Sequence, residues 1–117
     1  MSRDASADKI YEVLYQMGLT ANYTGFFQIA AAVQLSLETP QRLCLVTRWL
    51  YPDVAIQCQT TAGAVERNIR TAIARIWSED PDRLARIART PLSRRPTNAQ
   101  FLGLLVAYLS RVSPDQP

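Results

Sequence analysis

The stretch that decides the fold is TTAGAVERNIRTAIARIW, residues 60–77. Its apolar residues recur every three or four positions, which is the spacing of one face of an α-helix. Val65, Ile69, Ala72 and Ile76 form this apolar stripe. The pattern predicts an amphipathic helix over residues 61–77, with its apolar side packed on the core of the protein.

The opposite side of this helix combines small residues with long charged ones: Gly63, Ala64, Glu66, Arg67, Arg70 and Thr71. Small residues let a helix come close to a DNA groove, arginine can donate two hydrogen bonds to guanine, and glutamate can accept one from cytosine. A solvated surface with an ordinary Glu66–Arg70 pair would account for the same residues. On these residues alone, DNA binding, binding of a partner protein and an ordinary surface all stay open.

Helical periodicity extends over most of the remaining chain, and no segment alternates as a strand would. We expect a first helix that follows the capping candidates Ser6 and Asp8 and stops at Gly18. Further helices are predicted over residues 22–38, 43–50, 52–59 and 82–89, and a last one starts at Thr97 or Asn98. The predicted fold is therefore all-α, in a single domain over residues 1–117.

The net charge of +3 is concentrated in one part of the 117-residue chain. Residues 1–60 carry four basic and five acidic side chains, whereas residues 61–95 carry eight arginines and four acids. Such asymmetry is typical of a polyanion-binding face, although scattered solvated charge produces it too. A basic stripe recurs every three residues at Arg83, Arg86 and Arg89. It is either solvated or directed to phosphates.

Composition argues against several other classes of protein. The chain has no histidine, so a zinc site or a Ser-His-Asp triad has little to be built from. We therefore expect no enzyme activity, catalytic residue, metal, cofactor or small-molecule substrate. No apolar run could span a bilayer and the N-terminus lacks a secretory segment, so we expect a cytoplasmic protein without a membrane partner. Cys44 and Cys58 are predicted to be small buried side chains.

Residues 52–77 have the layout of a helix-turn-helix: a short helix, a tight polar turn and a longer helix. In that motif the first helix supports the second, whose outer face enters the major groove. Three aromatic residues flank the pair, and their spacing predicts that they pack in the core: Trp49, Tyr51 and Trp77. Asn68 lies near the buried side of the second helix, where packing is favoured over a contact with adenine.

Three motifs, LYPDVA (residues 50–55), TTAxxVERxIRxAIxxxW (60–77) and PTNxxF (96–101), occur in this order and at these separations. Together they resemble the C-terminal effector domain of the stage zero sporulation protein A family, the master response regulators of endospore formation. The resemblance runs from about Ile10 to Leu109. It implies a six-helix bundle containing a helix-turn-helix. It also implies a recognition helix that reads a double-stranded DNA box with central C·G pairs, with two copies bound in tandem as a homodimer.

The resemblance also assigns roles to residues. The base-reading glutamate and arginines of the family match Glu66, Arg67 and Arg70, and its phosphate-contacting residues correspond to Arg94 and Arg95. The remaining members of the predicted DNA-binding surface are Thr61, Gly63, Ala64, Thr71 and Thr97. Phe101, Leu105 and Leu109 on the last helix are the expected place for self-association.

This sequence departs from the family at several positions. Gly63 and Ala64 replace a serine and an arginine, and Asn68 and Thr71 replace an alanine and a frequent histidine. Losing the polar pair should weaken DNA affinity. The alternative function is therefore a protein-interaction module or competitor that keeps the fold with weak or no specific DNA binding. We also expect no receiver domain, which fits either a stand-alone effector or an excised fragment.

Overall fold

The computed structural model describes residues 2–111, with side chains from Ala7 onward. The elements are α1 (Ser2–Gln16), α2 (Phe26–Glu38), the 3₁₀ turn η1 (Pro40–Cys44), α3 (Val46–Trp49), α4 (Tyr51–Cys58), α5 (Ala62–Glu79), α6 (Pro81–Ala88) and α7 (Asn98–Arg111). Over these residues no strand is present, so the prediction of an all-α fold is confirmed. Six of the helices have eight or more residues, while α3 is a single turn.

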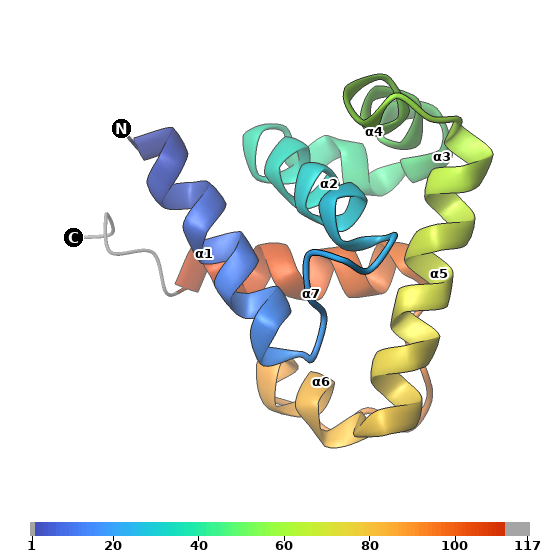
Figure 1. The fold of residues 1–117 in the computed structure, drawn as a ribbon. Coiled ribbons are helices and arrows are strands. Elements are labelled where there is room, and N and C mark those ends of the chain that lie inside the picture. Colours follow the sequence, from blue (N-terminus) through green and yellow to red (C-terminus); the bar gives the residue numbers. More distant parts are fainter. Residues whose placement is uncertain (1, 112–117) are drawn as a thin grey trace.

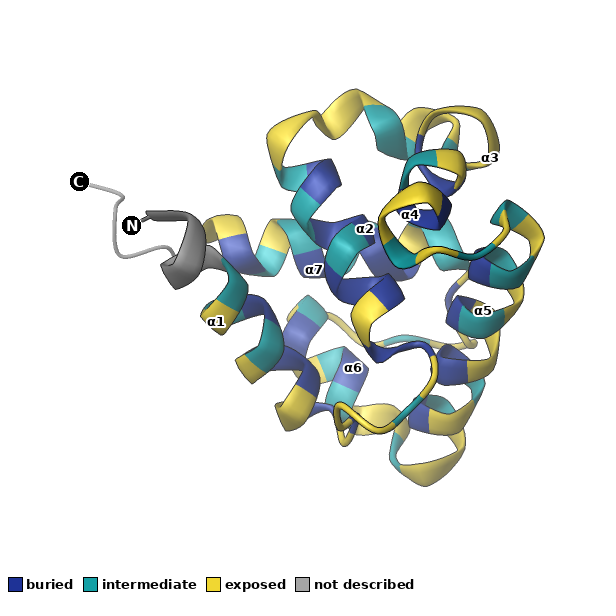
Figure 2. Cartoon of the chain, turned by 45° about the horizontal axis from the view of Figure 1, so that its top comes forward, coloured by how far each residue is buried: buried dark blue, intermediate teal, exposed yellow. Residues whose placement is uncertain are grey.

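Helix α2 lies at the centre and packs against α1, α4, α5 and α7. Helix α7 crosses the molecule behind α1 and lies below α2 in this view, and α5 runs along one side (Figure 1). The side chains at the centre are fully buried, among them Phe26, Ile69 and Phe101. The buried parts of α2, α5 and α7 face one another, and exposed positions lie on the outer surface (Figure 2). Burial of this apolar surface is the main term that stabilises such a bundle.

Helices α4 and α5 are joined by only three residues, 59–61. Helix α4 carries Pro52 in its first turn and ends at Cys58, and its C-cap residue Gln59 has a left-handed backbone (φ 56°). Thr61 then caps α5, because its hydroxyl oxygen accepts a hydrogen bond from the Ala64 N–H at 3.1 Å. The short helix, turn and longer helix expected from the sequence therefore occur in that order, and α5 extends to Glu79.

Other boundaries differ from the sequence-based expectation. Helix α1 begins at Ser2, so Ser6 and Asp8 lie inside it and do not cap it. Helix α2 begins at Phe26, after Gly25. Residues 43–50 do not form one helix, because the extended backbone of Leu45 (φ −151°) separates η1 from α3.

This interruption of the helix at Leu45 explains why some burial predictions were wrong. Trp49 is 47% exposed and Cys44 is exposed, because a single helical turn offers no continuous face to the core. Tyr51 is buried as predicted, Trp77 is partly buried against the core, and Cys58 is half-buried. Trp49 and Cys44 both lie on short turns, where too few residues follow one another for periodicity to define a buried face.

Helix α7 contributes Phe101, Leu105 and Leu109 to the core, where they are at most 6% exposed. These side chains pack inside the domain, which corrects the expectation that they form a self-association surface. On α6, the half-buried Arg83 donates a hydrogen bond to the Met17 carbonyl at 3.0 Å and lies 3.6 Å from a Glu79 carboxylate oxygen. Arg83 thus joins α6 to the end of α1, which corrects the proposed phosphate stripe at this position.

Gly18 follows the end of α1 with a φ of +91°, so the predicted glycine stop is confirmed. Over residues 2–111, none of the helices combines the length and the apolar character that crossing a membrane requires.

Candidate nucleic-acid interface

The outward face of α5 is exposed along the N-terminal half of the helix. Gly63, Arg67, Arg70 and Thr71 are exposed, whereas Ala64 and Glu66 are partly exposed. The opposite stripe of Val65, Ile69, Ala72 and Ile76 is at most 1% exposed. The predicted division of this helix into an apolar back and a polar front is therefore confirmed.

Arg67 lies in the middle of this polar front. Among residues 7–111, no hydrogen bond or ion pair engages its guanidinium group. The neighbouring Arg70 forms an ion pair with Glu66, one helical turn earlier. Both partners are about half exposed to solvent, so the pair itself contributes little to stability.

The other flank of α5 is engaged in packing. The Asn68 side-chain amide donates a hydrogen bond to Gln28 Oε1 on α2 at 3.1 Å, so the expectation that Asn68 serves packing is confirmed. The Arg75 guanidinium lies 5.5 Å from the centre of the Tyr23 ring and 3.4 Å from a Glu79 oxygen. Arg67 and Arg70 are therefore the arginines of α5 that face outward without contacts to another element.

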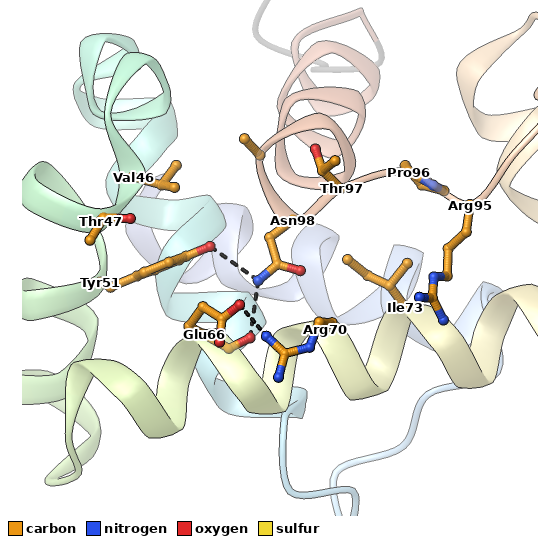
Figure 3. Close-up of a pocket in the computed structure, with 11 residues that line it drawn as sticks. Val46, Thr47, Tyr51, Glu66, Arg70, Ile73, Arg95, Pro96, Thr97 and Asn98 are labelled. Carbon is orange, nitrogen blue, oxygen red and sulfur yellow. Dashed lines mark hydrogen bonds and ion pairs between the residues drawn. The ribbon is translucent and has the colours of Figure 1, made fainter.

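A pocket of about 440 Å³ lies beside Glu66 and Arg70 (Figure 3). Its other walls come from α3, from Tyr51 at the start of α4, from the segment before α7 and from the first turn of α7, including Thr47, Arg95 and Thr97. The fold thus brings residues near position 96 next to the front of α5, although about thirty positions separate them in the sequence.

The predicted site residues fall into two groups. Glu66, Arg70, Arg95 and Thr97 share the pocket. The others lie outside the pocket and are at least partly exposed, on α5, at its N-cap or in the segment before α7: Thr61, Gly63, Ala64, Arg67, Thr71 and Arg94.

The hydroxyl groups of Thr61 and Thr97 both cap helices. Thr97 Oγ1 accepts a hydrogen bond from the Gln100 N–H at 3.2 Å, and Gln100 Oε1 accepts one from the Thr97 N–H at 2.9 Å. This reciprocal arrangement is a capping box. A hydroxyl that accepts a hydrogen bond still has its own hydrogen to donate. Each threonine can therefore cap its helix and bind an anion simultaneously.

Asn98 was predicted only as an alternative helix cap, but it connects three helices. Its side-chain amide donates hydrogen bonds to the Tyr51 hydroxyl at 3.1 Å and to the Glu66 carbonyl at 3.0 Å. Burial raises the pKa of the Tyr51 hydroxyl, and the nearby Glu66 raises it too, whereas the Asn98 hydrogen bond and Arg70 lower it. The start of α7 is thereby fixed against α4 and α5 at the base of the pocket.

We expect Asn98→Ala to lower the free energy of unfolding by about 1–2 kcal/mol, because it removes two hydrogen bonds at a half-buried position. Urea denaturation of the variant and the wild type measures this difference. Gln100→Ala, which removes only the capping-box side chain, should cost less than Asn98→Ala. An Asn98→Ala variant as stable as the wild type would show that the Tyr51 and Glu66 contacts add nothing.

A comparison with known protein families matches residues 10–109 to the family described as "Sporulation initiation factor Spo0A C terminal". The chain belongs to this family. The match covers the chain from Ile10 in α1 to Leu109 in α7, and thus includes the whole candidate interface. The Spo0A C-terminal family consists of DNA-binding effector domains in the regulation of sporulation. The family resemblance inferred from the three sequence motifs is therefore confirmed, and this chain is a DNA-binding effector domain.

Proposed function

We propose that this domain is a sequence-specific regulator of transcription that binds double-stranded DNA through a helix-turn-helix at residues 52–77. In this arrangement α4 supports α5, and the outward face of α5 enters the major groove. The observation that carries the proposal is the exposed Arg67 guanidinium, flanked by the small residues Gly63 and Thr71 on a helix of a DNA-binding family. Such a regulator acts on the chromosome in the cytoplasm.

The chemistry of the three charged side chains suits a C·G pair. A guanidinium group can donate two parallel hydrogen bonds to guanine O6 and N7, and a carboxylate can accept one from the cytosine amino group. We assign the first contact to Arg67 and the second to Glu66, which pairs with Arg70. Arg70 can donate to a neighbouring base or orient the carboxylate.

Arg94, Arg95 and Thr97 are proposed to contact phosphates at the edge of the groove. They lie in or next to the segment that closes the pocket beside α5, and all three are exposed. Phosphate contacts fix the orientation of a protein on DNA without reading its sequence. We propose a similar phosphate contact for Thr61, the N-cap residue of α5.

We expect Arg94→Ala to weaken binding to specific and unrelated duplexes alike. Since each phosphate contact releases about one counterion, the slope of log affinity against log salt should flatten by about one. Fluorescence anisotropy at several salt concentrations measures both quantities. A loss confined to one DNA sequence would instead give Arg94 a role in base reading.

Selection from a randomised duplex pool tests the proposed function as a whole. Enrichment of one motif supports sequence-specific binding, and tandem copies of that motif then test binding as a homodimer. Flat, weak binding that salt abolishes would favour the alternative, a protein-interaction module with the same fold. Gly63 and Ala64 favour that alternative, because the front of α5 lacks the polar serine and arginine that the family has at these two positions.

A further inference from the structure

A second exposed surface lies on η1, α3 and α4. The described residues include five large apolar side chains that are exposed, and three of them fall within residues 45–56. Leu45 is 44% exposed, Trp49 47% and Ile56 76%. Scattered apolar residues on a surface are common, but a concentration of them within one short stretch of the chain is typical of an interaction site.

A cavity of about 630 Å³ adjoins Trp49 on this surface and is lined by Thr39, Gln41, Arg42, Arg48, Trp49 and Asp53. Arg42 is held in place, because its guanidinium donates a hydrogen bond to the Trp49 carbonyl at 2.6 Å and forms an ion pair with Asp53. Its Nε atom is buried and has no hydrogen-bond partner. Arg48 is exposed, and none of the ion pairs within residues 7–111 involves it. Two guanidinium groups and one carboxylate leave the cavity net positive.

The cavity opens on a different side of α3 from the proposed DNA-binding surface. Val46 and Thr47 line the pocket beside α5, whereas Arg48 and Trp49 line this cavity. Successive residues of one helical turn point in different directions, so both surfaces can be occupied at the same time. DNA bound along α5 would leave Trp49 available.

The extent of the surface favours a protein over a small ligand. Asp53 and Ile56 are three positions apart on α4 and therefore share one face of that helix. The apolar surface thus continues a turn beyond the cavity, to the most exposed large apolar side chain of the described residues. Tryptophan and arginine are also the residues that most often dominate the binding energy of protein interfaces.

We propose that this surface, made by Leu45, Arg48, Trp49 and Ile56, docks an acidic segment of a partner protein. An apolar side chain of that segment packs beside Trp49, and a carboxylate of the segment pairs with the exposed guanidinium of Arg48. The proposal does not depend on DNA binding, because none of these side chains is on α5.

Selection from a displayed library of short random peptides tests the proposal. Peptides are selected on the full chain and counter-selected on the Trp49→Ala variant. We expect the retained sequences to combine Asp or Glu with a large apolar residue. A retained peptide, synthesised and labelled, should bind Arg48→Glu and Trp49→Ala about ten-fold or more weakly than the wild type.

Two matched variants control for general charge and apolarity. Tyr15→Ala removes a similarly exposed aromatic on α1, and Arg89→Glu reverses a charge at the end of α6. Neither should change peptide affinity, and circular dichroism checks that every variant is folded. Recovery of no peptide that distinguishes the wild type from Trp49→Ala, or only of basic peptides, would overturn the proposal. Displacement of the peptide by random duplex DNA would also overturn it, by assigning the surface to nucleic acid.

Discussion

Arg67→Ala should weaken binding to the best DNA site by about 1–3 kcal/mol and relax the preference at one base pair. The guanidinium group at position 67 belongs to an exposed residue at the centre of the α5 front and forms no hydrogen bond or ion pair within the described part of the protein. Its removal should therefore leave the fold intact, and the whole effect should appear in DNA binding. Anisotropy titrations against the selected site and its single-base variants measure both changes.

Arg75→Ala is the matched control on the same helix. Its guanidinium lies over the Tyr23 ring and near Glu79, away from the proposed groove contact. We expect this variant to keep the base preference of the wild type, with at most a small change in stability. If Arg67→Ala leaves affinity and preference unchanged, or if Arg75→Ala alters them as strongly, Arg67 does not read a base.

Gly25→Ala should lower the free energy of unfolding by about 1–3 kcal/mol through overpacking. A Cβ atom at this position would lie 2.9 Å from the Asn68 carbonyl oxygen and 3.7 Å from the Ala72 Cβ, both on α5. The carbonyl belongs to a helix backbone, which cannot give way as a flexible side chain would. Urea denaturation followed by circular dichroism measures the loss.

Gly103→Ala provides the contrast, because a Cβ atom there would have no heavy atom within 4 Å apart from its chain neighbours and the backbone of its own helix. Within α7, alanine should raise the free energy of unfolding by about 0.5–1 kcal/mol relative to glycine. Opposite signs at positions 25 and 103 are therefore expected from the same substitution. A stabilising Gly25→Ala would mean that α2 and α5 do not approach each other as closely as described.

The sequence predicts the front and back of α5 well, because eighteen helical residues give periodicity enough repeats to separate the two faces. The turn before this helix was also predictable, because threonine is a favoured N-cap residue. The stop at Gly18 follows from the tolerance of glycine for a positive φ. Each of these features depends on residues that are close together in the sequence.

Features that depend on distant residues were not predicted. No local pattern indicates that Asn98 donates to Tyr51 and Glu66, since those contacts exist only after three helices have packed. The exposure of Trp49 was missed for a related reason, because the backbone break at Leu45 turns a periodic segment into two short turns. The pocket beside α5 likewise needs the segment before α7 to be placed against it.

The Glu66–Arg70 pair has a consequence for how wrong sequences would be rejected. In the proposed complex with DNA, Arg70 would hold the Glu66 carboxylate in a fixed position, so that Glu66 would lose less rotational freedom on docking. Opposite guanine, however, the same fixed carboxylate would face the acceptor atoms O6 and N7, and two acceptors repel each other. Discrimination would then come as much from repelling the reversed base pair as from attracting the right one.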